Sequence, residues 1–467
     1  IQLTRDYITT AAMRDYIDVA DINLLSGVYR GSAGAREHLK NCFVRVAQVE
    51  YPANQIPRSI VPFEVWGDNL YLPNDTVRPD KLVRVHWEGC GILQEIEALP
   101  PAPVLLDTIS FNVYQSTSRT VHRDSSSNVF VVAQDTYNIL RMYKITTDEL
   151  TGISTSTRMD SAHEPGLYAY DNGKLDSRLD PDGVTIHTVV GIKSGSYPNL
   201  YAGFMYVTFN MSTGLWGTPE IVLNSDSTIG NDSHAAAISL DSAGVPHVVF
   251  TPTWLLRYSN RIGGVWSAVE TAINLGQTAG IVSAYHGSDD TLHVSVSDQS
   301  GFIYYNTRTS TGVWGTAVRI PAQFNTPYPL ASDGVVIDRS NRPHAAFFAE
   351  YGTPPSGPSI IKIRHMWKDG TWQSETIDLA SEFKAGGLAM YIDKGATEDN
   401  YHVTFSDSVT KVIWEIHKYG SALWSTPSVV STLGSALITN NLSSSGIIDF
   451  TFQPVSAGPI YWFRYLV

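Results

Sequence analysis

Residues 240–250 read LDSAGVPHVVF, and residues 337–347 repeat the pattern as IDRSNRPHAAF. The same frame recurs in residues 179–190 (LDPDGVTIHTVV), 288–296 (SDDTLHVSV) and 401–405 (YHVTF). The polar turn favours a hairpin, because short Asp, Asn and Ser side chains bond the local backbone and Gly accepts a positive φ. The pattern therefore predicts two strands joined by a tight turn, with a histidine early in the second strand.

Two weaker copies, residues 124–132 (DSSSNVFVV) and 443–452 (SSSGIIDFTF), lack the histidine. The histidine position and its equivalents then fall at 130, 187, 247, 293, 344, 402 and 449, which makes seven units of about 53 residues. Regular repetition at this spacing is typical of propeller blades and solenoids. The repeat is therefore the feature of this sequence that best indicates its fold.

Each unit continues with a second apolar run, such as residues 255–259 (LLRYS), then a Gly-x-Trp turn and a third run. Five units carry the tryptophan, at Trp216, Trp266, Trp314, Trp372 and Trp424. Counting the apolar run before each Asp turn, a unit has four short strands. Seven units of four strands predict an all-β fold, a seven-bladed β-propeller.

The ends of the repeat predict how the ring closes. The seventh unit stops at its third run, residues 460–467, and a spare apolar run, residues 104–109, precedes the first unit. We expect residues 104–110 to complete the last blade, which leaves fewer open sheet edges. The propeller domain is thus predicted to span residues 104–467.

The succession of Asp-x-x-Gly-x-x-His-Val-x-Phe, Leu-x-Tyr and Gly-x-Trp resembles the BNR/sialidase-like superfamily of β-propellers. The resemblance covers about 364 of the 467 residues. It implies the propeller fold and a setting among secreted, cell-surface and phage proteins. It implies no single activity, because the superfamily includes sialidases, polysaccharide lyases and lectins. Sialidases usually also carry Ser-x-Asp-x-Gly-x-Thr-Trp boxes, of which this chain has no good copy.

Residues 1–103 lack the repeat and form a separate small module in our interpretation. Residues 4–19 predict a short amphipathic helix, and residues 43–51, 60–66 and 81–87 predict strands. The proline-rich segment at residues 99–103 predicts a semi-rigid linker between this module and the propeller. We expect the module to anchor the propeller to a larger assembly.

The two cysteines, Cys42 and Cys90, flank the first and last predicted strands of this module. Two cysteines are too few for a disulfide scaffold, so buried thiols are the favoured interpretation, and a bridge between neighbouring strands stays open.

Composition excludes several classes of function. Charged residues are 16% of the chain and the formal net charge is −13, so no basic excess exists to bind a nucleic-acid backbone. With 43% hydrophobic residues the chain can bury a core, yet no run of 18 apolar residues predicts a membrane span.

The repeated histidines, His187, His247, His293, His344 and His402, are interpreted as structural. Zinc needs ligands within about 2 Å of one ion, whereas equivalent positions on separate blades are spread around a ring. We expect each histidine to be hydrogen-bonded within its own blade. The five repeated tryptophans are expected to pack between blades.

Polar residues that break the repeat are the better ligand candidates. In a propeller the segments before the innermost strands converge near the axis, and there the chain carries His163, Glu164, Asp232, His234, Tyr328 and Lys384. A histidine beside a carboxylate supports general acid–base catalysis, but it equally binds sugar hydroxyls or caps a loop. A structural role is the first interpretation of these residues, ligand binding comes next, and catalysis comes last.

Enzymatic alternatives lack an assembled set of residues. Arg119, Arg123, Arg257 and Arg364 are not spaced as the arginine cluster of a sialidase. Glu164 and Asp232 are candidates for a glycosidase pair, which needs carboxylates about 5–10 Å apart. A lyase would draw its base and cation from His163, His234, Tyr328 and Lys384, although net acidity disfavours a polyanionic substrate.

Neither a cofactor nor a metal is expected. The turn at residues 180–183 (DPDG) lacks the later acidic ligands of a calcium loop. No phosphate-binding loop, nucleophile elbow or His-Glu-x-x-His motif occurs.

The sequence thus predicts a non-enzymatic extracellular protein that binds a glycan or a cell-surface receptor. A virion fibre or spike component is the leading interpretation, with attachment through residues 1–103. The alternatives are a secreted lectin-like propeller and a carbohydrate-active enzyme, either a polysaccharide lyase or a glycosidase.

Overall fold

The computed structural model divides the chain into two compact units, residues 1–101 and residues 102–465. It describes residues 64–66, 69–73, 82–88, 92–96, 104–106, 119–126, 128–134, 139–147, 154–162, 168–169, 175–194, 201–225, 235–252, 254–277, 279–298, 302–320, 335–351, 360–377, 379, 385–394, 399–407, 410, 412–431, 438–442, 447–452 and 461–466. All regular structure in these ranges is β, and none of their elements is an apolar helix long enough to cross a bilayer.

The first unit contains one antiparallel sheet with the order β1-β2-β3-β4. Its strands are β1 Glu64–Trp66, β2 Asn69–Pro73, β3 Leu82–Glu88 and β4 Ile92–Ile96. β1 and β3 fall on the second and third predicted strands. The predicted helix over residues 4–19, the strand over 43–51, Cys42 and Cys90 lie outside the described residues.

The second unit is a succession of antiparallel sheets. The first three comprise β6 Val121–Arg123, β7 Val129–Gln134, β8 Leu140–Thr147 and β9 Ser154–Ala162; then β10 Tyr168–Ala169, β11 Leu175–Leu179, β12 Thr185–Ser194, β13 Tyr201–Asn210, β14 Leu215–Trp216 and β15 Glu220–Ser225; then β16 Ala236–Leu240, β17 Pro246–Phe250, β18 Leu255–Ile262, β19 Val265–Trp266 and β20 Glu270–Asn274.

The next three have four strands each. They comprise β21 Ala279–His286, β22 Leu292–Asp298, β23 Ile303–Arg308 and β24 Val318–Arg319; then β25 Val336–Ile337, β26 Pro343–Tyr351, β27 Ile360–Asp369 and β28 Thr371–Ile377; then β29 Ala385–Lys394, β30 Asp399–Asp407, β31 Ile413–Tyr419 and β32 Ser428–Ser431.

The remaining sheet, here called the closing sheet, combines the two ends of the second unit. Its order is β33-β34-β35-β5, with β33 Ile438–Leu442, β34 Ile447–Phe452, β35 Tyr461–Leu466 and β5 Val104–Leu105. Tyr461 lies opposite Leu105 and Trp462 opposite Val104. The last repeat unit therefore takes its fourth strand from the start of the domain.

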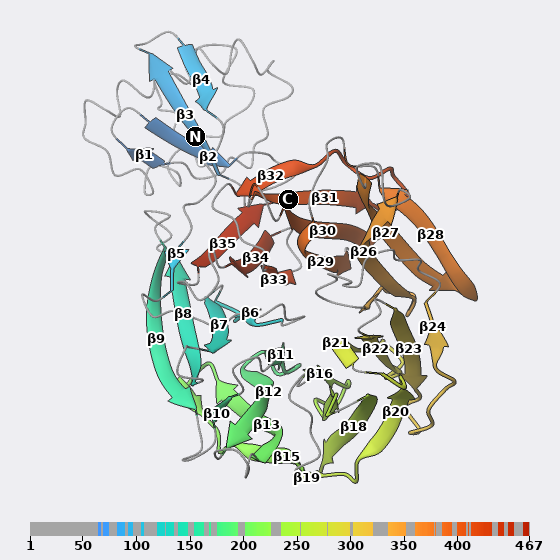
Figure 1. Ribbon diagram of the computed structural model, residues 1–467. Helices are drawn as coiled ribbons and strands as arrows, with labels where there is room; N and C mark the ends of the chain where they lie inside the picture. Colours follow the sequence, from blue (N-terminus) through green and yellow to red (C-terminus); the bar gives the residue numbers. More distant parts are fainter. Residues whose placement is uncertain are drawn as a thin grey trace. The chain divides into compact units, whose positions relative to one another are not determined.

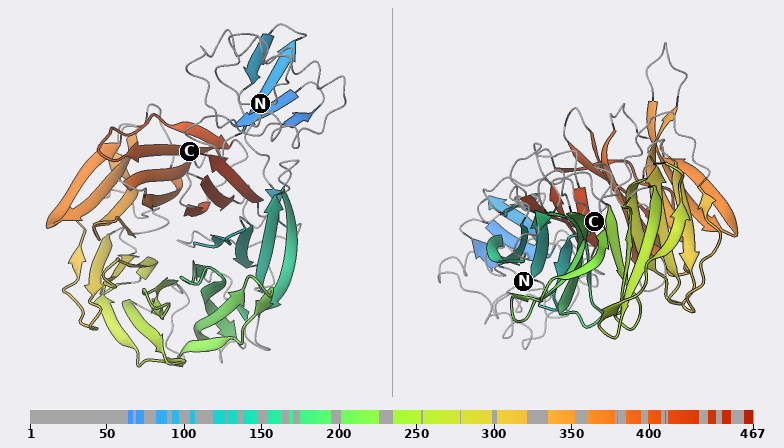
Figure 2. Two further views of the ribbon diagram at one scale, coloured as in Figure 1. Left: turned by 180° about the vertical axis from the view of Figure 1, so that it is seen from behind. Right: turned by 60° about the horizontal axis from the view of Figure 1, so that its bottom comes forward.

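These sheets follow one another around a centre, as Figures 1 and 2 show. A strand at the inner edge of its sheet, such as β6, β11 or β16, lies toward the centre, and the last strand, such as β9, β15 or β28, lies toward the rim (Figure 1). This arrangement is the all-β propeller that the repeat predicts.

The number of blades differs from the prediction in one respect. Among the described residues, six sheets are each built from one continuous stretch of chain, not seven. The reason is that the seventh repeat unit has no outer strand of its own.

The Asp turns form as their composition predicts. The Asp241 carboxylate accepts the backbone N–H of Ala243 (3.0 Å) and Val245 (2.8 Å), and Gly244 has φ = 76°. In the equivalent turn after Asp338, Asn341 takes the left-handed conformation, with φ = 60°. Asn tolerates this region better than most residues do.

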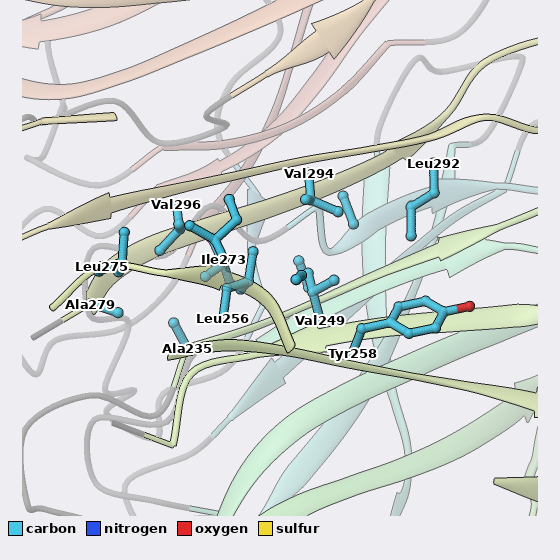
Figure 3. Close-up of a cluster of buried hydrophobic side chains, with 14 residues drawn as sticks. Ala235, Val249, Leu256, Tyr258, Ile273, Leu275, Ala279, Leu292, Val294 and Val296 are labelled. Atoms are coloured by element: carbon cyan, nitrogen blue, oxygen red, sulfur yellow. The ribbon is translucent and has the colours of Figure 1, made fainter. Parts of the chain in front are cut away.

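The core lies between neighbouring sheets. Figure 3 shows one such layer, where Val249, Leu256 and Ile273 of the β16–β20 sheet pack against Val294 and Val296 of the β21–β24 sheet. Burying one Val or Leu side chain is worth about 1.5–3 kcal/mol. Apolar side chains of this kind thus hold neighbouring sheets together.

Candidate functional site

The polar candidates from the sequence all lie outside the described residues. They are His163, Glu164, Asp232, His234, Tyr328 and Lys384. In the chain, residues 163 and 164 follow β9, Tyr328 lies between β24 and β25, and the other three precede β16 or β29. Their distances from one another are therefore not described, and all six stay predictions from the sequence.

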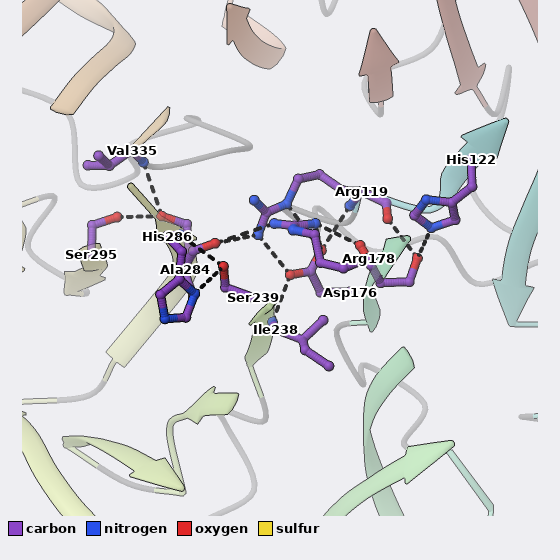
Figure 4. Close-up of polar contacts among 12 residues, drawn as sticks. Arg119, His122, Asp176, Arg178, Ile238, Ser239, Ala284, His286, Ser295 and Val335 are labelled. Atoms are coloured by element: carbon purple, nitrogen blue, oxygen red, sulfur yellow. Dashed lines mark hydrogen bonds and ion pairs between the residues drawn. The ribbon is translucent and has the colours of Figure 1, made fainter. Parts of the chain in front are cut away.

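A polar network that sequence reasoning missed joins the innermost strands (Figure 4). At its centre is Asp176 on β11, whose side chain is fully buried. Its carboxylate accepts from Arg119 Nη2 (2.9 Å), Arg178 Nη1 (3.1 Å) and the backbone N–H groups of Arg119 (3.1 Å) and Ile238 (2.9 Å). One carboxylate thus connects β11 and β16 with the segment that leads into β6, in three different sheets.

The two guanidinium groups extend the network to a fourth sheet. Arg119 Nη2 also donates to the carbonyl of Ala284 on β21 (2.9 Å). The Arg119 guanidinium carbon lies 4.0 Å, and that of Arg178 5.1 Å, from the ring centroid of Tyr285. Arg178 Nη1 also donates to the Ser177 carbonyl (2.7 Å), so both arginines are held by a carboxylate, a carbonyl and an aromatic face.

Hydroxyl groups complete the connections. Ser177 Oγ donates to the Arg119 carbonyl (2.7 Å) and bonds His122 Nε2 (2.7 Å). Ser239 Oγ accepts from the backbone N–H of His286 (3.0 Å). Ser283 Oγ on β21 accepts from the backbone N–H of Val335 (3.0 Å), which leads into β25. The network thus runs through five consecutive sheets.

Burial sets the protonation of this network. It raises the pKa of Asp176 to about 6, although Arg119 and backbone N–H groups act in the opposite direction. It lowers the pKa of His122 and of His286 to about 3. At neutral pH the histidines are uncharged and the carboxylate is engaged by N–H donors of Arg119, Arg178 and Ile238, so the network braces the inner wall and offers no free base.

The repeated histidines form a second kind of chain. His187 Nε2 lies 2.9 Å from Asp180 Oδ2, and its Nδ1 lies 2.6 Å from the Tyr206 hydroxyl. His247 bonds Tyr258 in the same way (2.8 Å), and His293 bonds Tyr305 (2.7 Å). In the next two sheets His344 bonds His365 (2.9 Å) and His402 bonds Glu415 (3.0 Å).

An Asp–His–Tyr chain resembles a catalytic triad, but its environment speaks against that role. Tyr206, Tyr258 and Tyr305 are buried, and burial raises the pKa of each hydroxyl above its usual value. A nucleophile needs the opposite shift. Each histidine also lies on a separate sheet, and the described residues contain no group of three or more His, Cys, Asp or Glu that would hold a metal.

The repeated tryptophans lie where one sheet meets the preceding sheet. We name each such contact by its tryptophan. In the Trp266 seam, the ring lies edge-on to Tyr206 (5.2 Å between centroids), and the indole N–H donates to Glu220 (3.1 Å). Arg261, directly opposite Trp266 in its hairpin, also pairs with Glu220 (2.7 Å). Aromatic packing and a carboxylate thus connect the two sheets.

The Trp314 and Trp424 seams repeat this arrangement. Trp314 packs on Tyr258 (5.4 Å) and donates to Glu270 (2.7 Å), which Arg308 pairs at 2.9 Å. In the Trp424 seam the ring packs on His365 and the indole N–H donates to Glu375 (2.9 Å). Lys418 pairs with the same carboxylate at 3.0 Å. The sequence analysis did not identify these three glutamates. A pattern that could have found them is a Glu three or four positions after a repeated Trp.

One described tryptophan side chain is exposed to solvent. Trp254, between β17 and β18, is 57% exposed, and it is the only exposed tryptophan among residues whose exposure the structure describes. The Leu275 N–H donates to its carbonyl (3.1 Å). The Thr251 N–H donates to the Ala235 carbonyl (3.0 Å), so the chain enters β16 at the end of the sheet where it leaves β17.

No family model and no curated protein sequence matches the chain. Among solved structures, the chain is similar to a polysaccharide lyase described as an ulvan lyase, with 12% identity and a TM-score of 0.49 over 78% of this chain and 96% of the lyase. It is also similar to Aleuria aurantia lectin in complex with Fucα1-6GlcNAc, with 15% identity and a TM-score of 0.37 over 69% of this chain and 98% of the lectin.

At these identities the similarities say nothing about activity. The class of this protein therefore rests on its own sheets: it is an all-β propeller whose inner strands are braced by a buried polar network. The BNR/sialidase-like resemblance is supported only to the level of the propeller fold.

Proposed function

We propose that this chain is a non-enzymatic binding protein whose propeller holds a carbohydrate ligand. The observation that carries the proposal is the exposed ring of Trp254 at the sheet end where β16 begins. Asp232 and His234 lie just before β16 in sequence. An aromatic face beside a few polar groups is the usual composition of a small-ligand site.

The inner polar network supports a binding role. Its carboxylate and guanidinium groups are engaged with one another, so they hold the ring rigid. A rigid scaffold that carries variable loops is a common way to build a binding site.

Glycan-array binding of the full chain tests this proposal. Trp254→Ala and His234→Ala are expected to reduce binding at least tenfold, which corresponds to about 1.4 kcal/mol. Leu423→Ala is the matched control, because Leu423 is 92% exposed and belongs to another sheet. Unchanged binding by the first two variants would remove the site from consideration.

The rival proposal, a carbohydrate-active enzyme, has a separate readout. The full chain is incubated with a panel of neutral and uronic-acid polysaccharides, and reducing ends and unsaturated products are measured. Turnover that Glu164→Gln or His234→Ala abolishes would contradict a non-enzymatic role.

We also propose an extracellular setting, with the module of residues 1–103 attaching the propeller to a larger assembly such as a virion fibre. Mass photometry of the full chain distinguishes the alternatives. A symmetric oligomer favours the assembly component, and a monomer favours a secreted lectin-like protein.

For the fold itself we propose that the closing sheet acts as the seventh blade. Residues of β6 and β7 share a buried cluster with Trp462 and Leu106, and β33 contacts both β29 and β6. Deleting residues 102–106 is expected to lower the melting temperature by several degrees. No change would show that the closing sheet does not hold the ring.

A further inference from the structure

The Trp372 seam has the parts of the Trp266, Trp314 and Trp424 seams except one. Trp372 lies edge-on to Tyr305, with 5.5 Å between ring centroids, as Trp266 and Trp314 do to their tyrosines. Lys368 lies directly opposite Trp372 in its hairpin and 5.5 Å above the Tyr305 ring. The aromatic pair and the cation are therefore in place.

The carboxylate is the missing part. In the Trp266, Trp314 and Trp424 seams a glutamate lies on the outer strand, directly opposite Tyr206, Tyr258 or His365. The residue opposite Tyr305 is Val318. Since the valine side chain has no acceptor, this seam holds two donors whose counterparts in the Trp266, Trp314 and Trp424 seams are joined through one carboxylate.

Among the described residues, neither donor has the carboxylate partner that its counterparts have. The indole N–H of Trp372 is buried and has no hydrogen-bond acceptor among the described residues. No carboxylate among the described residues pairs with Lys368, whereas Arg261, Arg308 and Lys418 each have a carboxylate partner. A buried N–H without an acceptor costs free energy, so a carboxylate that reaches it relieves that cost.

We propose that the Trp372 seam binds a small carboxylate from solution, such as a simple organic acid or the acidic group of a sugar. The carboxylate pairs with Lys368 and, when the Val318 side chain moves aside, accepts the indole N–H of Trp372. Val318 is 37% exposed, so the approach to the position is from the surface. This inference does not depend on the glycan site at Trp254.

Ligand-observed NMR titrations with glucuronate, acetate and glucose test the proposal on the full chain. Glucuronate is expected to bind, and glucose is not. Binding of acetate equal to that of glucuronate assigns the position to simple carboxylates, and stronger binding of glucuronate assigns it to acidic sugars. Absence of binding by both carboxylates overturns the proposal.

Two variants locate the binding. Val318→Glu places a carboxylate from within the chain at this position, and Lys368→Met removes the cation; each is expected to weaken carboxylate binding about tenfold. Val313→Glu is the matched control, because it adds the same charge at a turn residue of the same sheet that is 63% exposed. Equal binding by Val318→Glu and Val313→Glu overturns the proposal.

A gain of binding completes the test. Glu270→Val makes the Trp314 seam equivalent to the Trp372 seam, so the number of carboxylates bound per chain is expected to rise from one to two. An unchanged number would contradict the assignment of the position. Neutral-glycan binding at Trp254 is measured in parallel, and it is expected to stay the same in all four variants.

Discussion

The Trp314 and Trp372 seams share one arrangement of a tryptophan, a tyrosine and a cation, and they differ in whether a carboxylate lies opposite the tyrosine. Both place a tryptophan edge-on to a tyrosine, at 5.4 and 5.5 Å, and both hold a cation over that tyrosine. Glu270 lies opposite the tyrosine in the first and Val318 in the second. Aromatic packing is thus common to both seams, and the carboxylate is a separate contribution that can be added or removed.

The largest effect is expected where the carboxylate has most partners. Glu375 accepts from His365 (2.8 Å), Trp424 (2.9 Å) and Lys418 (3.0 Å). Burial acts to raise the pKa of Glu375, but these three contacts outweigh it and lower the pKa to about 2. Glu375→Val makes this seam resemble the Trp372 seam. We expect it to lower the free energy of unfolding at pH 7 by about 3 kcal/mol, since three donors lose their acceptor. Urea unfolding measures this change.

Acid should weaken the Trp424 seam more than the Trp266, Trp314 and Trp372 seams, because its tryptophan packs on His365 where theirs pack on a tyrosine. Burial lowers the pKa of His365 to about 4; the neighbouring His344 and Lys418 act in the same direction, and Glu375 opposes them. The unfolded chain therefore binds a proton below about pH 6.5 that the folded chain does not, so stability falls as pH drops from 6.5 toward 4.

His365→Tyr tests this pH dependence. The new hydroxyl would take the place of Nε2 against His344, as Tyr305 bonds His293. We expect the loss of stability between pH 7 and pH 5 to be smaller than in the unchanged chain by about 2 kcal/mol. The same pH slope in both proteins would show that His365 is not the group that titrates.

A smaller loss is expected for Glu270→Val, because the Glu270 side chain is 37% exposed and solvent screens its pairing with Arg308. The remaining cost is the indole N–H of Trp314, about 1–2 kcal/mol. Urea unfolding measures the loss, and Glu270→Gln is the matched control, because it removes the charge and keeps an acceptor for the indole. A loss above that of Glu375→Val would contradict the order of the seams.

The smallest expected change is an increase in the free energy of unfolding. Val318→Glu supplies an acceptor to Trp372 and a partner to Lys368, and we expect it to raise the free energy of unfolding by about 1 kcal/mol. Val313→Glu is expected to change it by less than about 0.5 kcal/mol, as surface substitutions usually do. Equal changes in the free energy of unfolding for the two variants would mean that Trp372 and Lys368 do not stabilise a carboxylate at position 318.

The sequence predicted what repeats within one unit. The Asp turn at Asp241, the strand histidine His247 and the turn tryptophan Trp266 recur at fixed spacing, so the four-stranded units and the propeller class could be inferred. The partners that cross from one sheet to the next could not. Trp314 meets Glu270 of the preceding sheet, 44 positions earlier in the chain. A local pattern does not report such a pairing.

The inner network was missed for the same reason. Arg119 and Asp176 are 57 positions apart, and Arg119 and Ala284 are 165 positions apart. Neither Arg119 nor Asp176 belongs to a repeated motif. The candidates that were chosen because they break the repeat, such as Glu164 and His234, belong to segments outside the described residues, and their roles stay predictions.

The central claim is that a carboxylate at the outer strand bonds the tryptophan of the following sheet. A double-mutant cycle of Val318→Glu and Trp372→Phe, followed by urea unfolding, tests it most directly. We predict a coupling of about 1 kcal/mol, with the gain from Val318→Glu lost when phenylalanine removes the indole N–H. Additive effects of the two substitutions would contradict the claim.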